Sequence, residues 1–121
     1  MKQRFDAIVV GAGPAGCACG YSLAKAGLET LVVERGKFAG AKNMWGGAFY
    51  GPTLNQLFPR FWEKAPVERY ILRHRFSMLT SDASLSAEFT TRKFGVPPYN
   101  GFSLLRSRFD RWFASKTEQA G

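Results

Sequence analysis

The sequence predicts an α/β fold that opens with a parallel βαβ unit and continues with an antiparallel ribbon and a helix. Three observations support this class. Two short β-branched runs flank a glycine-rich turn and a helical stretch in the first 34 residues. Further along, two alternating apolar stretches flank a polar turn, which is typical of a hairpin. The last segment carries aromatic residues at helical spacing.

The first strand is expected over residues 5–10, where a continuous apolar run is typical of a parallel strand covered on both faces. The turn GAGPAG follows directly. In such a turn Gly11 permits the tight bend, and Gly13 lets the backbone approach a pyrophosphate. Gly16 lets the helix pack close to the strand. The spacing therefore predicts a phosphate-binding turn at the start of a helix.

The helix is expected to reach about Ala26, with Gly27 as its left-handed cap. A second strand is expected over residues 30–34, and Glu34 at its end follows Gly11 by 23 positions. A carboxylate at this place accepts hydrogen bonds from an adenosine ribose. The stretch therefore predicts a Rossmann-like dinucleotide-binding unit; the other interpretation is a βαβ unit whose glycines serve packing only. The small inward side chains are expected to be Ala15, Ala18, Cys19 and Leu23.

A dinucleotide fold needs a sheet of several parallel strands, and this fingerprint supplies two. No further strand–helix alternation of that kind follows residue 34 in the 121 residues. We therefore expect an incomplete domain that belongs to a longer protein.

The chain carries a formal charge of +8 from 17 basic and 9 acidic residues. Basic residues are concentrated over 60–75 and 92–111. Nucleic acid is one class of partner for a basic chain, but the sequence has no nucleic-acid-binding motif, so we expect none. A dinucleotide is itself an anion, and a basic face can also dock an acidic protein.

Residues 7–24 carry no charge, as in a membrane span or a signal peptide. Their glycines and proline make a poor spanning helix, and Asp6 lies where a signal would be basic. We therefore expect a cytoplasmic chain. Cys17 and Cys19 lie two apart on one helix and point in different directions, so we expect small buried residues and no metal site.

The stretch from residue 35 to residue 59 is rich in glycine and has no charge after Lys42. This composition predicts no regular helix or long strand. It is typical of an ordinary connection, or of backbone that passes close to a flat or phosphorylated group.

Glu34-Arg35-Gly36 followed by GAKNMWGG at residues 40–47 resembles the electron-transfer-flavoprotein:quinone oxidoreductase family. Its FixC-type members, in the geranylgeranyl-reductase-like group of flavoproteins, are the most similar. The resemblance implies FAD as the cofactor. It implies that the ADP half is held by Gly11, Gly13, Gly16, Glu34 and Arg35. It also implies that the flavin side is approached by Lys42, Asn43, Gly46 and Gly47.

After residue 61 the alternation predicts strands over 68–79 and 85–91, joined by a turn at 80–84. This antiparallel ribbon matches the way such flavoproteins begin a substrate-facing layer. His74, the sole histidine, lies between two arginines and is interpreted as a solvated strand residue rather than an acid or base.

Residues 93–101 predict a loop, and residues 102–105 a short strand that leads into the last helix. Ser107 is expected to be the N-cap, with Asp110 three residues later completing a capping box. In the resembling family the pattern Arg-x-x-Phe-Asp-x-Trp recurs, and its first arginine reaches the FAD. Arg106 is therefore a cofactor candidate, and Asp110 is interpreted as a cap.

The resemblance divides the chain into the N-terminal part of an FAD-binding domain (1–60), a ribbon of the substrate-side layer (61–101), and a strand and helix that return to the first domain (102–121). The implied activity is to accept electrons from electron-transfer flavoprotein and pass them toward quinone, with peripheral association at the inner membrane face. Electron transfer needs a positioned cofactor, so we name no catalytic residue. The alternatives are a prenyl reductase or aromatic hydroxylase, an NAD(P) enzyme, and an inactive nucleotide-binding fragment.

Overall fold

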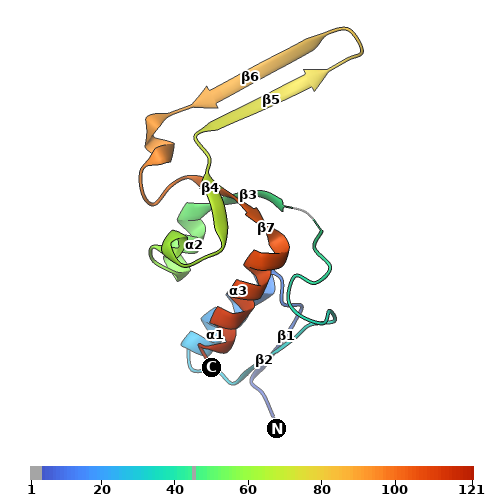
Figure 1. Cartoon of the computed structure of the whole chain (residues 1–121). Coiled ribbons are helices and arrows are strands. Elements are labelled where there is room, and N and C mark those ends of the chain that lie inside the picture. Colours follow the sequence, from blue (N-terminus) through green and yellow to red (C-terminus); the bar gives the residue numbers. More distant parts are fainter. Residues whose placement is uncertain (1–3, 45) are drawn as a thin grey trace.

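The computed structural model describes residues 4–44 and 46–121, so Trp45 of the 40–47 motif lies outside the described residues. Figure 1 shows the helices packed below a ribbon that extends away from them. The elements, in chain order, are β1 (Ala7–Val10), α1 (Pro14–Lys25), β2 (Thr30–Val33), β3 (Gly46–Tyr50), α2 (Gly51–Leu57), the short helix η1 (Phe61–Glu63), β4 (Val67–Tyr70), β5 (Arg73–Leu79), β6 (Ser84–Thr90), the short helix η2 (Arg92–Gly95), β7 (Gly101–Leu105) and α3 (Arg106–Glu118).

The βαβ unit has the predicted order and orientation. Strands β1 and β2 pair in parallel, from Ala7 opposite Thr30 to Val10 opposite Val33. Helix α1 connects them, and Gly27 follows its end with φ +83°, which confirms the left-handed cap. The α/β class expected from the sequence is confirmed.

The inward face of α1 differs from the expected one. Cys17 and Gly20 are its buried residues, whereas Ala15 and Cys19 are exposed. The reason is that α1 lies between β2 and α3, so the residues that face inward are those that contact these two elements. A Cβ on Gly20 would lie 2.8 Å from Val32 Cγ2 on one side and 3.1 Å from Thr117 Cγ2 on the other. The expectation that both cysteines are buried was therefore wrong for Cys19.

A second sheet has the antiparallel order β3-β7-β4. The expected glycine-rich loop thus contains a strand, β3, and the helix α2. The strand forms because β7 supplies a partner: Gly46 pairs with Leu105, and a Cβ on Gly46 would lie 2.5 Å from the Leu104 carbonyl oxygen. Helix α2 carries Pro52 in its first turn, where the missing N–H is tolerated.

The predicted long strand over 68–79 is two strands. β4 pairs with β7, and β5 pairs with β6 in a separate two-stranded sheet. The break comes at Ile71, whose N–H donates to the Gly101 carbonyl at 2.8 Å. The turn at the far end is as expected, since Thr80 N–H donates to the Ala83 carbonyl at 2.8 Å.

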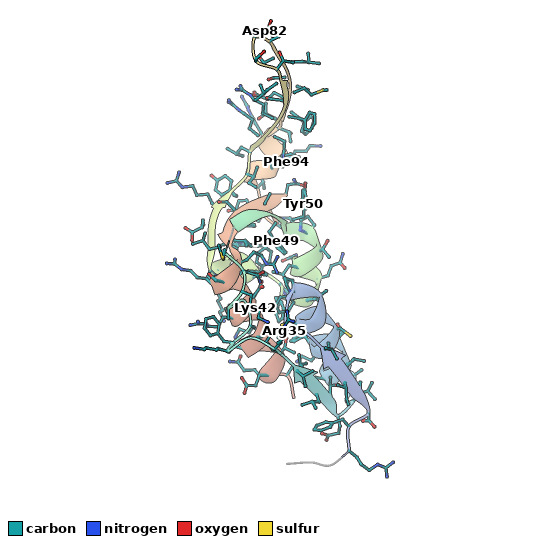
Figure 2. All side chains as sticks on the ribbon, turned by 90° about the vertical axis from the view of Figure 1, so that its right-hand side faces the viewer. Arg35, Lys42, Phe49, Tyr50, Asp82 and Phe94 are labelled. Carbon is teal, nitrogen blue, oxygen red and sulfur yellow. The ribbon has the colours of Figure 1, made fainter. Side chains whose placement is uncertain are left out.

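Strands β5 and β6 form an extended ribbon whose tip is marked by Asp82 in Figure 2. The pairing places His74 opposite Phe89 on one face of the ribbon. His74 is half-buried, its ring meets that of Phe94 edge-on at 5.7 Å, and its Nε2 is buried without a hydrogen-bond partner. The interpretation of His74 as a solvated residue was therefore wrong, because η2 folds back against the base of the ribbon.

The core lies between α1, α3 and the β3-β7-β4 sheet. Phe109 of α3 is fully buried and packs at 5.1 Å from the ring of Phe49 in β3. Thr117 at the other end of α3 donates to the Cys17 carbonyl of α1 at 3.0 Å. These contacts fix α3 against both the βαβ unit and the second sheet, and so they set the position of its first turns.

Within the described ranges, no helix is long and apolar enough to cross a membrane. The same ranges contain no group of three or more His, Cys, Asp or Glu side chains that could hold a metal ion.

Candidate functional site

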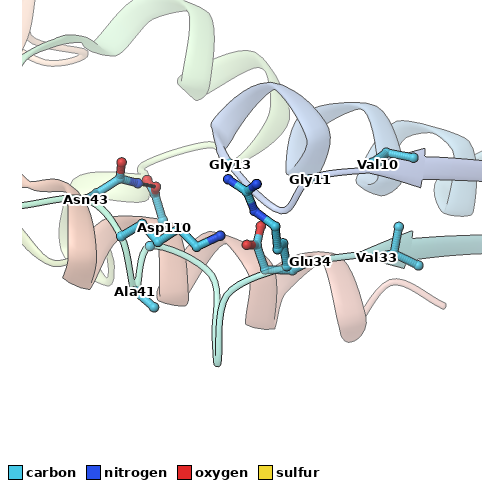
Figure 3. Close-up of a pocket in the computed structure, with 11 residues that line it drawn as sticks. Val10, Gly11, Gly13, Val33, Glu34, Ala41, Asn43 and Asp110 are labelled. Atoms are coloured by element: carbon cyan, nitrogen blue, oxygen red, sulfur yellow. Dashed lines mark hydrogen bonds between the residues drawn. The ribbon is translucent and has the colours of Figure 1, made fainter.

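A hollow of about 650 Å³ opens at the carboxyl ends of β1 and β2 (Figure 3). This edge of a parallel sheet is where open α/β folds bind ligands. Among the predicted site residues, six line this hollow: Gly11, Gly13, Glu34, Arg35, Lys42 and Asn43. The other lining residues are Val10, Val33, Gly40, Ala41 and Asp110.

Glu34 is the fixed carboxylate of the hollow. Its Oε1 accepts from the Gly36 N–H at 2.6 Å, and its Oε2 accepts from the Ala12 N–H at 2.9 Å. These two hydrogen bonds, that from Gly36 first, lower the pKa of Glu34 below its usual range. An ionised carboxylate has about four lone-pair sites, so acceptor capacity remains for a ligand.

The start of α1 forms a second wall. Gly13 is the N-cap, and no side chain caps the helix. The first N–H groups of a helix have no partner within it, and together with the helix dipole they attract anions. A Cβ on Gly13 would meet nothing within 4 Å, so the backbone here faces open space.

Gly16 does not line the hollow. A Cβ at this position would lie 1.9 Å from the Gly11 carbonyl oxygen and 3.4 Å from Val9 Cγ1. The structure thus assigns Gly16 the packing role expected from the sequence, in which the helix approaches the strand and turn closely.

The loop between β2 and β3 supplies the positive charge. Arg35 and Lys42 line the hollow, and both charges favour the ionised form of Glu34, which contributes to its lowered pKa. Figure 2 shows both side chains on the body of the molecule, away from the tip of the ribbon. The loop also makes a cation–π contact with α3, because the Arg111 guanidinium lies 3.8 Å from the centre of the Phe38 ring.

Asp110 is not a helix cap. Helix α3 begins at Arg106, its N-cap is Leu105, and no side chain caps it, so the predicted capping box was wrong. The Asp110 side chain is fully buried. It accepts from Arg106 through both carboxylate oxygens at 2.9 Å, and Asn43 Nδ2 donates to Oδ2 at 2.6 Å. The bond to Asp110 raises the pKa of Arg106.

The remaining predicted residues line a smaller hollow of about 160 Å³. Gly46 and Gly47 of β3 lie there with Arg106, beside Pro14 at the start of α1. Apart from Gly16, the predicted set thus divides between two hollows, one lined by Gly11 and Gly13 and the other by Pro14. Five residues that line the larger hollow lie outside the predicted site set: Val10, Val33, Gly40, Ala41 and Asp110. Asp110 is the charged one, and its four-residue spacing from Arg106 is the signal that could have revealed their ion pair.

Comparison with known proteins decides the family. Residues 6–118 match the family described as FAD dependent oxidoreductase. The chain belongs to this family. FAD is accordingly the cofactor, as the resemblance implied.

The similar curated proteins confirm the more specific resemblance. Protein FixC of Azotobacter vinelandii is 42% identical over all 121 residues. The probable electron transfer flavoprotein-quinone oxidoreductase YdiS of Escherichia coli K12 is 45% identical over 98% of the chain. The chain spans 28% of the length of each of these relatives.

Solved structures show the same fold. A geranylgeranyl bacteriochlorophyll reductase-like protein from Thermoplasma acidophilum matches with a TM-score of 0.73 and 25% identity. The match covers 97% of this chain and 28% of that one. A myxobacterial FAD-dependent halogenase matches with a TM-score of 0.67 at 21% identity over 97% of this chain and 27% of its own, which supports the fold alone.

Proposed function

We propose that the larger hollow holds the ADP half of FAD, and that the chain is the cofactor-binding part of an oxidoreductase that accepts electrons from electron-transfer flavoprotein and passes them to quinone. The observation that carries the cofactor assignment is the Glu34 carboxylate, which two backbone N–H groups orient at the rim of the hollow. The relative described as a probable electron transfer flavoprotein-quinone oxidoreductase supports the electron-transfer reaction.

The lining residues fit an adenosine diphosphate. Glu34 has free acceptor sites for the two ribose hydroxyls. The open first turn of α1 offers N–H groups to the diphosphate, and the missing side chain of Gly13 lets its oxygens approach the backbone. Arg35 and Lys42 supply countercharge from the facing loop. The cradle thus combines acceptors for the ribose with donors and positive charge for the phosphates.

The smaller hollow extends this cradle toward the flavin side. Gly46 and Gly47 present backbone without side chains there, beside Arg106. FAD supplies the redox chemistry when bound, and the described residues of this chain bind and orient it. We assign no catalytic residue, because electron transfer requires a held cofactor rather than a nucleophile or base.

The cellular setting follows from this proposal. A quinone acceptor is lipid-soluble, so we propose a cytoplasmic protein that associates peripherally with the inner face of the membrane. The excess of basic over acidic residues favours docking to an acidic donor protein or to an anionic surface.

The first test is a titration of the purified chain with FAD, in which binding is measured as quenching of the flavin fluorescence. We expect saturable binding that ADP competes away. Glu34→Gln should weaken FAD binding about tenfold or more, because hydrogen bonds from the ribose hydroxyls to a charged acceptor are stronger than those to a neutral amide. The matched control is Glu68→Gln, an exposed carboxylate of β4 that lies outside both hollows. Equal affinity in wild type and Glu34→Gln would contradict the proposed ribose contact.

The reaction is tested by mixing the FAD-loaded protein anaerobically with reduced electron-transfer flavoprotein. Bleaching of the flavin band, and its return after addition of a soluble quinone, are the expected results. A flavin that stays oxidised with this donor would contradict the proposed reaction while leaving the cofactor assignment intact.

A prenyl reductase is a second candidate, favoured by the match to the geranylgeranyl bacteriochlorophyll reductase-like structure at 25% identity. The two reactions differ in what reoxidises the flavin. Return of the flavin band with a prenyl substrate, and not with quinone, would favour the reductase.

A further inference from the structure

Asp110 combines full burial with a place at the edge of the larger hollow. Burial of an ionised carboxylate is unfavourable unless charge and hydrogen-bond partners compensate it. Here the compensation comes from two elements far apart in the sequence. Arg106 lies one helical turn before Asp110 on α3, and Asn43 lies in the loop between β2 and β3.

The contacts of Asp110 attach the loop between β2 and β3 to α3. Asn43 Nδ2 donates to Oδ2, and Figure 3 shows this bond across the edge of the hollow. Gly40 lies directly over the same residue: a Cβ on Gly40 would lie 2.9 Å from Asp110 Cβ, and its φ of +83° favours glycine. The turn from Gly40 to Asn43, closed by a 3.0 Å backbone hydrogen bond, therefore rests on Asp110. Lys42 lies within that turn.

The guanidinium of Arg106 forms a bidentate ion pair with Asp110. Its Nε and Nη2 both donate to the carboxylate, each at 2.9 Å, and Arg106 is not among the residues that line the larger hollow. A carboxylate beside a hollow for a diphosphate would repel the ligand if its charge were not compensated. The bidentate pair supplies that compensation.

We propose that Asp110 is a positioning residue for the cofactor: paired with Arg106, it anchors Asn43 and holds the 40–43 turn as the far wall of the larger hollow. Arg106 thus supports the ADP half through Asp110 and not by touching it. This inference rests on the proposed function, because it assumes that the hollow receives an anionic ligand.

A double-mutant cycle tests the indirect role of Arg106. The variants are Arg106→Met, Asp110→Asn and the combination of both, each titrated with FAD. Arg106→Met should weaken FAD binding about tenfold or more, because it leaves a buried unpaired carboxylate at the hollow. Adding Asp110→Asn should restore most of the affinity, since a neutral amide needs no countercharge and its oxygen still accepts from Asn43. The control, Arg108→Met, removes the same charge from an exposed site on the same helix and should leave FAD binding unchanged.

The outcome separates two roles for Arg106. Because Arg106 also lines the smaller hollow, on the proposed flavin side, the same variants are titrated with ADP as well as with FAD. If the double variant binds ADP as weakly as Arg106→Met does, the arginine contacts the ADP half directly and the proposal is overturned. Recovery in the double variant supports it, because a change at Asp110 cannot replace a direct bond between the arginine and the cofactor.

The anchoring is tested without any ligand by hydrogen exchange of residues 36–44. Asn43→Ala removes the bond to Asp110 from the loop side and leaves the buried ion pair in place. We expect the backbone amides of residues 41 and 43, which donate to the Phe38 and Gly40 carbonyls, to exchange about tenfold faster than in wild type, on the scale of one hydrogen bond to a charged group. Exchange of the α1 amides should not change. Unchanged exchange of residues 36–44 would overturn the anchoring.

These two readouts keep the failures apart. If wild type does not bind FAD but the turn loosens in Asn43→Ala, the proposed function fails and the anchoring holds. If wild type binds FAD and the turn does not loosen, the proposed function stands and the role of Asp110 is refuted.

Discussion

Gly13 and Gly16, on either side of Pro14-Ala15, should respond in opposite ways to substitution by alanine: one variant should lose stability and the other FAD affinity. A methyl group on Gly16 would lie 1.9 Å from the Gly11 carbonyl oxygen, and backbone cannot move aside as a side chain can. Overpacking of this kind costs about 1–3 kcal/mol. Gly16→Ala should therefore lower the free energy of unfolding by that amount, measured by urea denaturation without FAD.

Gly13→Ala should leave stability nearly unchanged. The position is open to 4 Å, and its φ of −78° and ψ of 178° suit alanine. Alanine caps a helix less well than glycine, but it also lowers the entropy of the unfolded chain, so we expect a change below about 1 kcal/mol. The methyl group would instead occupy the space through which a diphosphate approaches the backbone. We expect FAD affinity to fall about tenfold, which is about 1.4 kcal/mol.

The structure therefore predicts a loss of stability in Gly16→Ala and a loss of FAD affinity in Gly13→Ala, and either measurement can refute it. Wild-type stability in Gly16→Ala would mean that α1 does not approach the Gly11 turn as closely as the structure shows. Wild-type FAD affinity in a folded Gly13→Ala would mean that the diphosphate does not lie against this turn. FAD titrations are done in the absence of urea, where circular dichroism shows whether both variants are folded.

Two further predictions concern pH and the contact between α1 and α3. Because the folded-state pKa of Glu34 is lowered, its contribution to stability is complete above the usual glutamate pKa of about 4.3 and is lost as pH falls through the lowered value. Urea unfolding of wild type and Glu34→Gln should differ at neutral pH and converge in acid; a pH-independent difference would contradict the hydrogen-bonded carboxylate. Thr117→Val removes the hydroxyl that donates to the Cys17 and Phe113 carbonyls and should cost about 1 kcal/mol in the same assay. Ser115→Ala, on the exposed side of α3, is its control, and equal stability of the two variants would refute the contribution of this hydrogen bond.

The βαβ unit could be predicted because its signals are local. The apolar runs, the glycine turn and Glu34 all lie within 30 residues of one another, so the pattern needs no information from the rest of the chain. The inward face of α1 could not be predicted in the same way. It depends on where α3 packs, and the contact between Gly20 and Thr117 joins residues 97 positions apart.

The role of Asp110 was missed for a different physical reason: two local patterns compete for the same residue. Ser107 and Asp110 have the spacing of a capping box, whereas Arg106 and Asp110 have the spacing of an ion pair on one helix face. The starting point of α3 decides between them. β7 pairs with β3 through Leu105, so the helix can begin only at Arg106, and Ser107 falls inside its first turn.

The same strand pair explains how two segments of the cofactor site come together. Residues 40–47 and 106–110 are separated by 58 residues, and neither segment contains a signal that identifies the other as its partner. The β3–β7 register places Gly46 opposite Leu105, which brings the glycine pair beside Arg106 in the smaller hollow. Asp110, one turn further along α3, then meets Asn43 just before β3. The β3–β7 pairing therefore sets the geometry of both hollows. A change that shifted its register would move Asn43 away from Asp110, and it would also move Gly46 and Gly47 away from Arg106.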